Sequence, residues 1–157
     1  MTASGVTLCD GALADLDGVM AVMEDSFDPG FGEAWTASQC AGMLPLTGVW
    51  LTLARAGPAV VGFALARATG DEAELLLLAV RRDRQGQGIG RQLIERFASS
   101  AHSRGAVRLH LEVREGNHAL NLYEQAGFRL VGRRRNYYSG VAGETYDALT
   151  LANGGSY

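Results

Sequence analysis

Lysine is absent from this 157-residue chain, in which all 14 basic residues are arginine. Without lysine there is no Schiff-base or P-loop side chain, which excludes the enzymes that depend on either. Cysteine is scarce: Cys9 and Cys40 have neither zinc-type nor redox-type spacing. We expect both to be reduced, small core residues. His102, His110 and His118 show no ligand spacing either, so no metal site is expected.

The chain also lacks long apolar runs and an N-terminal targeting segment. Its apolar stretches fall far short of the roughly 20 residues that a membrane span needs, and no charged-then-apolar leader opens it. With 17 acidic against 14 basic residues, the net charge is −3, which argues against general binding of nucleic acid or anionic lipid. The run of arginines at 133–135 is expected to be a solvated cluster on an edge strand. These features predict a cytoplasmic protein that binds neither nucleic acid nor membranes.

Hydrophobic residues make up 47% of the chain, enough at this length for one core and one domain, expected over residues 1–152. Apolar periodicity and turn signals predict one strand, two helices, three strands, a helix, a strand, a helix and two last strands, in that order. Strands are expected at 6–10, 49–56, 60–68, 73–80, 107–113, 128–138 and 145–152, and helices after Asp10, after Thr36, from Ile89 to about His102, and over 119–127. The apolar segment 73–80 is expected to be buried on both faces, and residues 153–157 to form a flexible tail.

Three helix ends have specific signals. Asp10 precedes apolar residues at helical spacing, so we expect it to cap that helix. Thr36 is followed three positions later by Gln39, the pattern of a capping box. Gly127 closes the last predicted helix and suits a left-handed cap.

The stretch "QGQGIGR", residues 85–91, places three glycines between the buried strand and the helix that starts at Ile89. Such a turn directs backbone N–H groups and the positive end of a helix dipole at one point, which suits a phosphate or pyrophosphate. A dinucleotide fingerprint would require glycine at Arg91 or Leu93, and a P-loop would require Gly-Lys-Ser/Thr, so both are excluded. The alternative without a ligand is a tight turn that merely needs glycine.

"QGQGIG" fits the pattern Q/R-x-x-G-x-G/A, and "NLYEQAGF" the L-Y-x-x-x-G-F signature, of the GNAT superfamily of N-acetyltransferases. The order of predicted elements is similar too, over nearly the whole chain. This resemblance implies an α/β fold with a central, mostly antiparallel mixed sheet, a splayed pair of parallel strands and about four flanking helices. It also implies acetyl-CoA as cosubstrate and no metal.

The resemblance assigns cofactor contacts to particular residues. The backbone from 86 to 91 would hold the pyrophosphate, the bulged end of strand 73–80 would bind the pantetheine arm, and the Val80 N–H would donate to the thioester oxygen. The family's N-x-x-A-x-x-L-Y is one residue shorter here, as "NHALNLY", which bears on Asn117. The implied cofactor-binding residues are Leu78, Ala79, Val80, Gln85, Gly86, Gln87, Gly88, Ile89, Gly90, Arg91 and Asn117.

Three stretches, "LEVRE", "RRRNYY" followed by "YDAL", and "AWTASQ", resemble the bacterial RimI-type enzymes, which acetylate the N-terminal alanine of a small-subunit ribosomal protein. This resemblance makes Glu112 the general base and Tyr123 the general acid. An N-terminal ammonium of pKa near ~8 must lose a proton before attack, and the departing thiolate must gain one. Trp35, Tyr137 and Tyr138 would wall a peptide groove, although "AWT" stands where that group tends to have Pro-Trp-Ser.

Other interpretations of these residues stay open. Glu112 could be an outward residue of an exposed strand, and Tyr123 could simply pack against the sheet. The acceptor could instead be a small amine, such as an antibiotic or polyamine, or a protein lysine; Asp25, Asp28 and Glu33 suit a basic peptide and a polyamine equally. A third alternative is a non-catalytic acyl-CoA-binding regulator.

Overall fold

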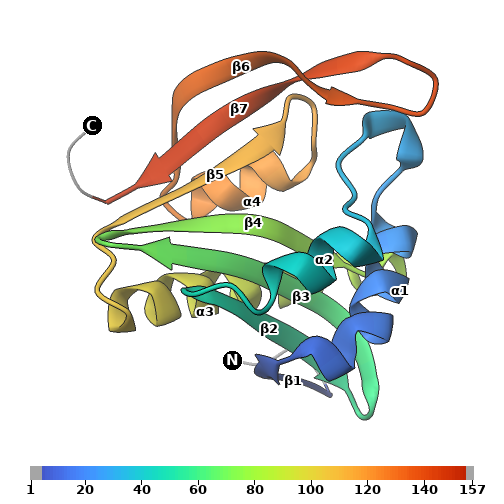
Figure 1. Ribbon diagram of the computed structural model, residues 1–157, viewed down its shortest axis with the longest axis vertical. Helices are drawn as coiled ribbons and strands as arrows, with labels where there is room; N and C mark the ends of the chain where they lie inside the picture. The colour runs from blue at the N-terminus through green and yellow to red at the C-terminus, as the bar shows by residue number, and fades with distance from the viewer. Residues whose placement is uncertain (1–4, 155–157) are drawn as a thin grey trace.

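The computed structural model describes residues 5–154 (Figure 1). The α-helices are α1 (Leu16–Ser26), α2 (Ala37–Met43), α3 (Ile89–Ser103) and α4 (Ala119–Gln125), with 3₁₀ helices η1 (Leu13–Asp15), η2 (Pro29–Phe31) and η3 (Arg82–Arg84). The strands are β1 (Val6–Gly11), β2 (Val49–Ala56), β3 (Ala59–Thr69), β4 (Glu72–Val80), β5 (Arg108–Arg114), β6 (Arg129–Ser139) and β7 (Thr145–Asn153). The order of strands and α-helices agrees with the sequence prediction. No helix in the described range is both long and apolar enough to cross a bilayer.

These strands form one sheet in the order β1-β2-β3-β4-β5-β7-β6. Neighbouring strands are antiparallel except β4 and β5, which run parallel. The predicted fold class is therefore confirmed, with a mostly antiparallel sheet that contains one parallel pair. β6 lies at an edge of the sheet, as expected for the strand that carries the arginine run 133–135.

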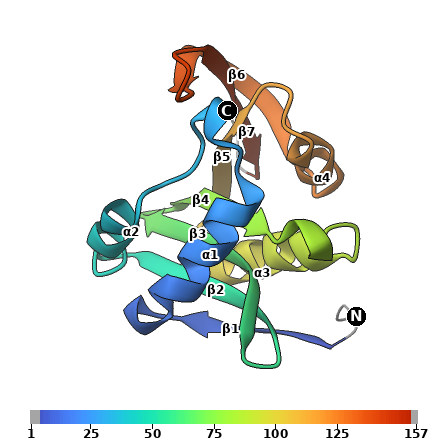
Figure 2. The same ribbon diagram turned by 90° about the vertical axis from the view of Figure 1, so that its right-hand side faces the viewer.

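The helices cover both faces of the sheet (Figure 2). α1 and α2 lie on one face, where Val22 and Met23 pack with Cys40 in one core cluster. α3 and α4 lie on the other face, and Leu93 and Phe97 of α3 are fully buried there in a second cluster. The predicted apolar face of α3 is therefore confirmed. Cys40 is a core residue as expected, whereas Cys9 is only half-buried.

The start of the first helix differs from the prediction. Asp10 belongs to β1, and the chain makes the η1 turn before α1 begins at Leu16. Asp15 lies at the helix start instead, where its carboxylate accepts a hydrogen bond from the backbone N–H three residues earlier and pairs with Arg55 at 2.6 Å. Asp10 joins the strand rather than capping the helix because all six residues of β1 gain pairing partners on β2, whereas an N-cap would satisfy one backbone N–H of the helix.

The capping box predicted for α2 is confirmed. Thr36 Oγ1 accepts from the Gln39 N–H at 3.1 Å, and Gln39 Oε1 accepts from the Thr36 N–H at 2.8 Å. Two helix donors are satisfied reciprocally, an arrangement typically worth about 1 kcal/mol. The box fixes the point at which the loop from α1 ends, and Trp35 immediately precedes it.

An irregularity in β4 opens the middle of the sheet. Its register against β3 shifts at Leu76, which has no partner on that strand, as in a β-bulge. β4 pairs with β5 only over 72–75, after which the two strands separate. Leu78 and Val80 are therefore only half-buried, and the expectation of a strand buried on both faces is wrong. The strands diverge beside the glycine turn, which follows directly from the end of β4.

The C-terminal strand is longer than predicted. Asn153 is the last residue of β7, and its side-chain amide donates to the Ala126 carbonyl at 3.2 Å. The predicted tail from 153 therefore starts too early, and its positions 155–157 lie outside the described residues. Gly127 has φ +95°, which confirms the left-handed residue after α4.

Candidate active site

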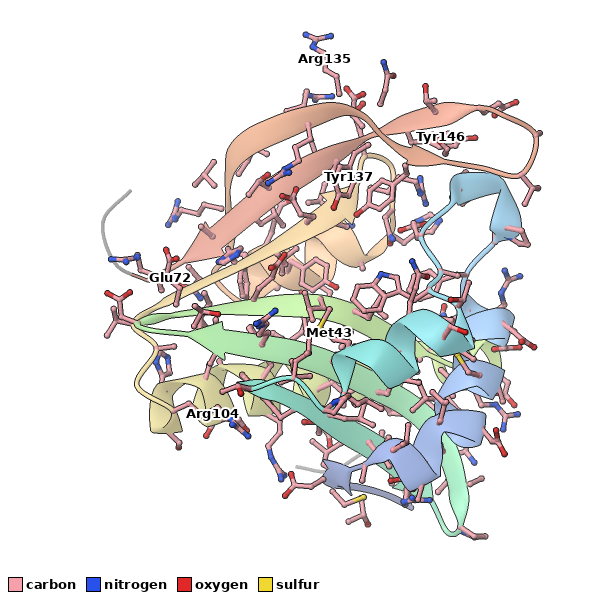
Figure 3. All side chains as sticks on the ribbon, in the orientation of Figure 1. Met43, Glu72, Arg104, Arg135, Tyr137 and Tyr146 are labelled. Atoms are coloured by element: carbon pink, nitrogen blue, oxygen red, sulfur yellow. The ribbon has the colours of Figure 1, made fainter. Side chains whose placement is uncertain are left out.

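A cleft of about 800 Å³ opens where β4 and β5 separate. The ends of these strands, the start of α3, helix α4, the loop from α1 to α2, and the β6–β7 hairpin form its walls. Figure 3 shows Tyr137 and Tyr146 on the hairpin side of this region, with Arg135 pointing away from it. All residues predicted for the site line the cleft except Gln87, namely Trp35, Leu78, Ala79, Val80, Gln85, Gly86, Gly88, Ile89, Gly90, Arg91, Glu112, Asn117, Tyr123, Tyr137 and Tyr138.

The turn between β4 and α3 has the geometry of an anion site. Gly86 and Gly88 have left-handed φ angles of +79° and +86°, and an added Cβ at either would meet no atom within 4 Å. Gly88 is also the N-cap of α3, so the first N–H groups of a 15-residue helix point out of this turn with no side-chain cap. Gly90 allows a close approach of α4, because an added Cβ would lie 2.9 Å from the end of the Leu122 side chain, which would have to shift.

The polar side chains around this turn are partly engaged already. Gln85 Nε2 donates to the Val80 carbonyl at 3.0 Å, which also accepts from Ser26 Oγ at 2.8 Å. Arg91 pairs with Glu95 at 3.1 Å on the exposed surface of α3. Gln85 thus holds the turn in place through its hydrogen bond to Val80. The positive potential at the turn comes from backbone N–H groups and from Arg91, whose charge is partly neutralised by Glu95.

The end of β4 presents backbone N–H groups to the cleft that have no partner strand on that side. The Arg81 N–H donates to Val61 O at 2.9 Å, and Val80 stands opposite Gly62 in the same ladder. Because hydrogen-bonded pairs alternate along antiparallel strands, the N–H groups of Val80 and Leu78 point away from β3. β5 has already separated from β4 at this level. This edge can therefore pair with an extended ligand.

Glu112 lies on β5 with its carboxylate held on two sides. Oε2 accepts from Thr150 Oγ1 at 2.8 Å, and Oε1 pairs with Arg134 Nε at 2.9 Å. The Glu112 side chain is 13% exposed, whereas Arg134 is 63% exposed. The Glu112 side chain is thus neither directed outward into solvent nor buried without partners. Each oxygen keeps a free lone pair, so the oriented carboxylate can still accept a proton.

Tyr123 is buried on α4, where its ring packs edge-on against Phe128 with the centroids 6.2 Å apart. Within residues 5–154, the Tyr123 hydroxyl has no hydrogen-bond partner. Every fully buried side-chain N or O atom in that range does have one, so the hydroxyl is not fully buried and opens to the cleft. Burial, followed by the neighbouring Tyr138 and Glu33, raises the pKa of Tyr123 well above its ordinary value. The phenol stays protonated at physiological pH, as a proton donor must.

The aromatic wall depends on an irregularity in β6. The register against β7 shifts between Arg134 and Tyr138, and Asn136 takes a left-handed φ of +53°. The Asp147 carboxylate accepts a hydrogen bond from the Asn136 N–H at 2.9 Å and stabilises this conformation. The rings of Tyr137 and Tyr138 pack edge-to-face beside the cleft, with their centroids 5.0 Å apart. Burial raises the pKa of Tyr138 far above its usual range, so it too remains neutral.

Asn117 lines the cleft, but its side chain is occupied within the protein. Its Oδ1 accepts from the Ala119 N–H at 2.8 Å, which begins α4, and its Nδ2 donates to Glu33 Oε2 at 2.7 Å. The shortened "NHALNLY" is accommodated by this turn, which leaves Asn117 less available to a ligand than the resemblance implies. Glu33 also pairs with Arg114 at 2.9 Å.

The three acidic residues predicted to meet a basic acceptor make contacts within the protein, although Asp25 and Asp28 stay exposed. Asp25 accepts from the Arg82 N–H at 2.8 Å, and Asp28 from the Gly30 N–H at 2.8 Å, in addition to the two contacts of Glu33.

Arg114 is a functional candidate that the sequence interpretation missed, although it stands in the quoted "LEVRE". Its position two residues after Glu112, on the same face of an alternating strand, was the available signal.

The arginine run on β6 is held by carboxylates. Arg133 pairs with Asp147 at 2.8 Å and with Glu115, and Arg134 pairs with Glu112. Arg135 is exposed at the edge of the sheet (Figure 3). These contacts confirm the expectation of an edge-strand charge cluster.

His110 is the titratable side chain on β5 beside Glu112. Its Nε2 lies 3.7 Å from Glu74 Oε1, and the interaction with Glu74 raises the pKa of His110, with smaller contributions from Glu72 and Glu112. Within residues 5–154, no three or more His, Cys, Asp or Glu side chains are grouped as metal ligands. When it is protonated, His110 therefore interacts electrostatically with the carboxylates of Glu74, Glu72 and Glu112.

A pH dependence of stability follows from this pKa. Because the folded pKa is raised, His110 contributes stability that is present in full below about pH 6.5, the unfolded value, and is lost as pH rises through the folded pKa. We expect the difference in Tm between wild type and His110→Gln to be largest near about pH 6 and to shrink as the pH rises through the folded pKa. Thermal unfolding across this range checks it, and a difference independent of pH would contradict it.

The chain was compared with known proteins. A sequence model of the "Acetyltransferase (GNAT) family" matches residues 16–128. The [Ribosomal protein bS18]-alanine N-acetyltransferases of Haemophilus influenzae and Escherichia coli K12 are 38% and 42% identical over 93 and 94 residues, which is 59% of this chain and 64% and 63% of theirs. The chain thus spans less than two thirds of these relatives. The crystal structure of the E. coli ribosomal-protein-S18-alanine N-acetyltransferase superposes with TM-score 0.84 at 30% identity, covering 97% of this chain and 95% of that one. The chain belongs to the GNAT family of acetyltransferases.

Proposed function

We propose that this protein is an acetyl-CoA-dependent N-acetyltransferase that acetylates the α-amine of a ribosomal protein with an N-terminal alanine. One observation carries the proposal. A single cleft joins an anion-binding glycine turn, an unpaired strand edge, an oriented carboxylate and a neutral phenol. The relatives named above are bS18-alanine N-acetyltransferases, which supports the choice of acceptor.

The residues of the cleft fit acetyl-CoA. Open space beside Gly86 and Gly88, together with the N-terminus of α3, suits a diphosphate. The outward N–H groups of Leu78 and Val80 suit the amide-rich pantetheine arm, which would add to β4 as a further strand. Acetyl-CoA supplies the activated acetyl group as a thioester. The Val80 N–H would donate to the thioester oxygen, where negative charge develops during attack.

Proton transfer is divided between Glu112 and Tyr123. Glu112 accepts a proton from the acceptor ammonium, directly or through one water, and so frees the nitrogen lone pair. Arg134 and Thr150 keep the carboxylate in one orientation for this transfer. Tyr123, protonated because it is buried, donates to the departing thiolate. The nitrogen of the tetrahedral intermediate loses its second proton as the thiolate leaves, and this proton restores the Tyr123 hydroxyl. The acetyl group passes directly from sulfur to nitrogen without a covalent enzyme adduct.

The acceptor would lie between Trp35 and the aromatic pair Tyr137 and Tyr138. Its amine must approach the thioester beside Val80, and we infer that these rings, which line the cleft, limit the size of the first side chain. Such a groove favours an extended N-terminus that begins with a small residue.

A peptide that copies the alanine start of the ribosomal protein should be acetylated at its α-amine, with one acetyl group gained per peptide by mass spectrometry. Replacing the first alanine with phenylalanine should lower kcat/KM by on the order of 10- to 200-fold, from crowding alone. The same peptide with a blocked N-terminus and a free internal lysine is the matched control, and it should stay unmodified. Preferential acetylation of that lysine, or of spermidine over every peptide, would replace this proposal with the side-chain or small-amine alternative.

A further inference from the structure

A buried ion pair lies at the acceptor end of the cleft. Arg114 Nε donates to Glu33 Oε1 at 2.9 Å, and both side chains are only 10% exposed. The second carboxylate oxygen accepts from Asn117 at 2.7 Å, and Arg114 also donates to the Glu115 carbonyl at 3.0 Å. We call Glu33, Arg114 and Asn117 the acceptor clamp. A charge buried this deeply must be paired, because an unpaired one is costly.

Two aromatic rings complete the clamp. The Arg114 guanidinium lies 3.7 Å from the centroid of Phe31 and 5.8 Å from that of Tyr146, and the two rings meet edge-to-face at 5.2 Å. Phe31 belongs to the loop between α1 and α2, and Tyr146 to the β6–β7 hairpin. A planar guanidinium stacked on Phe31, whose ring in turn contacts Tyr146, holds both segments against β5, which a lysine ammonium would do less well.

The clamp joins four segments that the acceptor would meet, which are the loop between α1 and α2, the β6–β7 hairpin, β5 and the start of α4. The loop also contacts the hairpin directly, since the Val141 N–H donates to Pro29 O at 3.2 Å and an added Cβ at Gly32 would collide with the Ser139 carbonyl. Arg114 stands two residues from the proposed base on β5, and Asn117 starts the helix that carries the proposed acid. In Figure 1 the loop rises from α1 to reach the β6–β7 hairpin.

We propose that Glu33 and Arg114 are positioning residues, which fix the loop and the hairpin as the two walls of the acceptor groove. The inference rests on the proposed function, because it concerns the same acceptor. Glu33 uses both oxygens, and Arg114 both Nε and Nη1, inside the protein. Both side chains line the cleft but are only 10% exposed and are held by these contacts, so we assign their effect to the rings and backbone of the two walls.

The test separates positioning from stability with three variants: Glu33→Gln, Arg114→Met, and the double variant. Each single change leaves one buried polar partner unmatched and should lower Tm. The double variant removes both charges and should recover most of the lost Tm. Its acceptor KM should stay raised on the order of 10- to 100-fold, because the groove walls are no longer fixed. Its affinity for CoA should equal that of wild type, since the glycine turn is untouched.

Hydrogen exchange gives a readout that needs no activity. Amides of residues 28–33 and 139–146 should exchange faster in Glu33→Gln, the mildest change, than in wild type. The matched control is Asp15→Asn, which breaks the Asp15–Arg55 pair outside the cleft; it should lower Tm but leave acceptor KM and these amides unchanged.

Recovery of both Tm and KM in the double variant would reduce the clamp to a stabilising contact and overturn the inference. Unchanged exchange of the two segments in Glu33→Gln would overturn it as well. If wild type acetylates no peptide, the proposed function fails, and the exchange result alone decides whether the clamp stands.

Discussion

Tyr123→Phe should lower turnover by about 10² to 10⁴-fold, the usual contribution of a general acid, with little change in acetyl-CoA binding. The expectation follows from a hydroxyl that opens to the cleft and from a pKa that burial raises, which keeps the proton in place. Phenylalanine preserves the packing against Phe128 and removes only the donor. Steady-state kinetics, together with CoA titration, measure both quantities.

The companion change, Glu112→Gln, should differ in its pH profile. Below about pH 8 the acceptor is an ammonium and needs a base, so the loss should be greatest at the acidic end of the range. Glu124→Gln, an exposed neighbour on α4, is the matched control and should retain wild-type rates. If Glu112→Gln and Tyr123→Phe both run at wild-type rates, the two side chains are structural and the direct transfer needs another base and acid.

Gly88→Glu should abolish CoA binding. The residue is the N-cap of α3 with φ +86°, and a glutamate there places a negative side chain in the open space assigned to the diphosphate. Loss of the rise in Tm that acetyl-CoA gives to wild type would report it, since a ligand bound only by the folded state stabilises that state.

Backbone strain alone could mimic this effect, so the control must carry the same strain. Gly57→Glu does so: Gly57 has φ +59° in the β2–β3 turn, and an added Cβ there also meets nothing within 4 Å. Both variants should lose stability, but Gly57→Glu should keep the response to acetyl-CoA. Unchanged CoA affinity in a folded Gly88→Glu protein would remove the glycine turn from the binding site.

Local signals in the sequence were sufficient for most elements. The Thr36 capping box, the glycine after α4 and the apolar face of α3 each depend on residues within a few positions of one another, and all three are confirmed. Asp10 was misassigned because the competing interaction, pairing of β1 with β2, joins residues at least 40 positions apart. The half-exposed edge of β4 has the same cause, since it depends on where β5 separates from it.

The site shows the same division. The glycine turn is a local motif, and its geometry follows from it. The clamp could not be predicted, because Glu33 meets Arg114 and Asn117 across more than 80 positions of chain. The contact of Arg134 with Glu112 was hidden for a similar reason, since β7 lies between their strands and the register of β6 shifts near that point.

A crystal structure with CoA joined covalently to an alanine-starting peptide tests the central claim most directly. The account predicts the diphosphate on the backbone N–H groups of residues 86–91, the pantetheine along the Leu78 and Val80 edge, and the alanine nitrogen between Glu112 and Tyr123. The peptide should leave between Trp35 and the β6–β7 hairpin. A diphosphate bound elsewhere, or an alanine nitrogen out of reach of both Glu112 and Tyr123, would contradict the account.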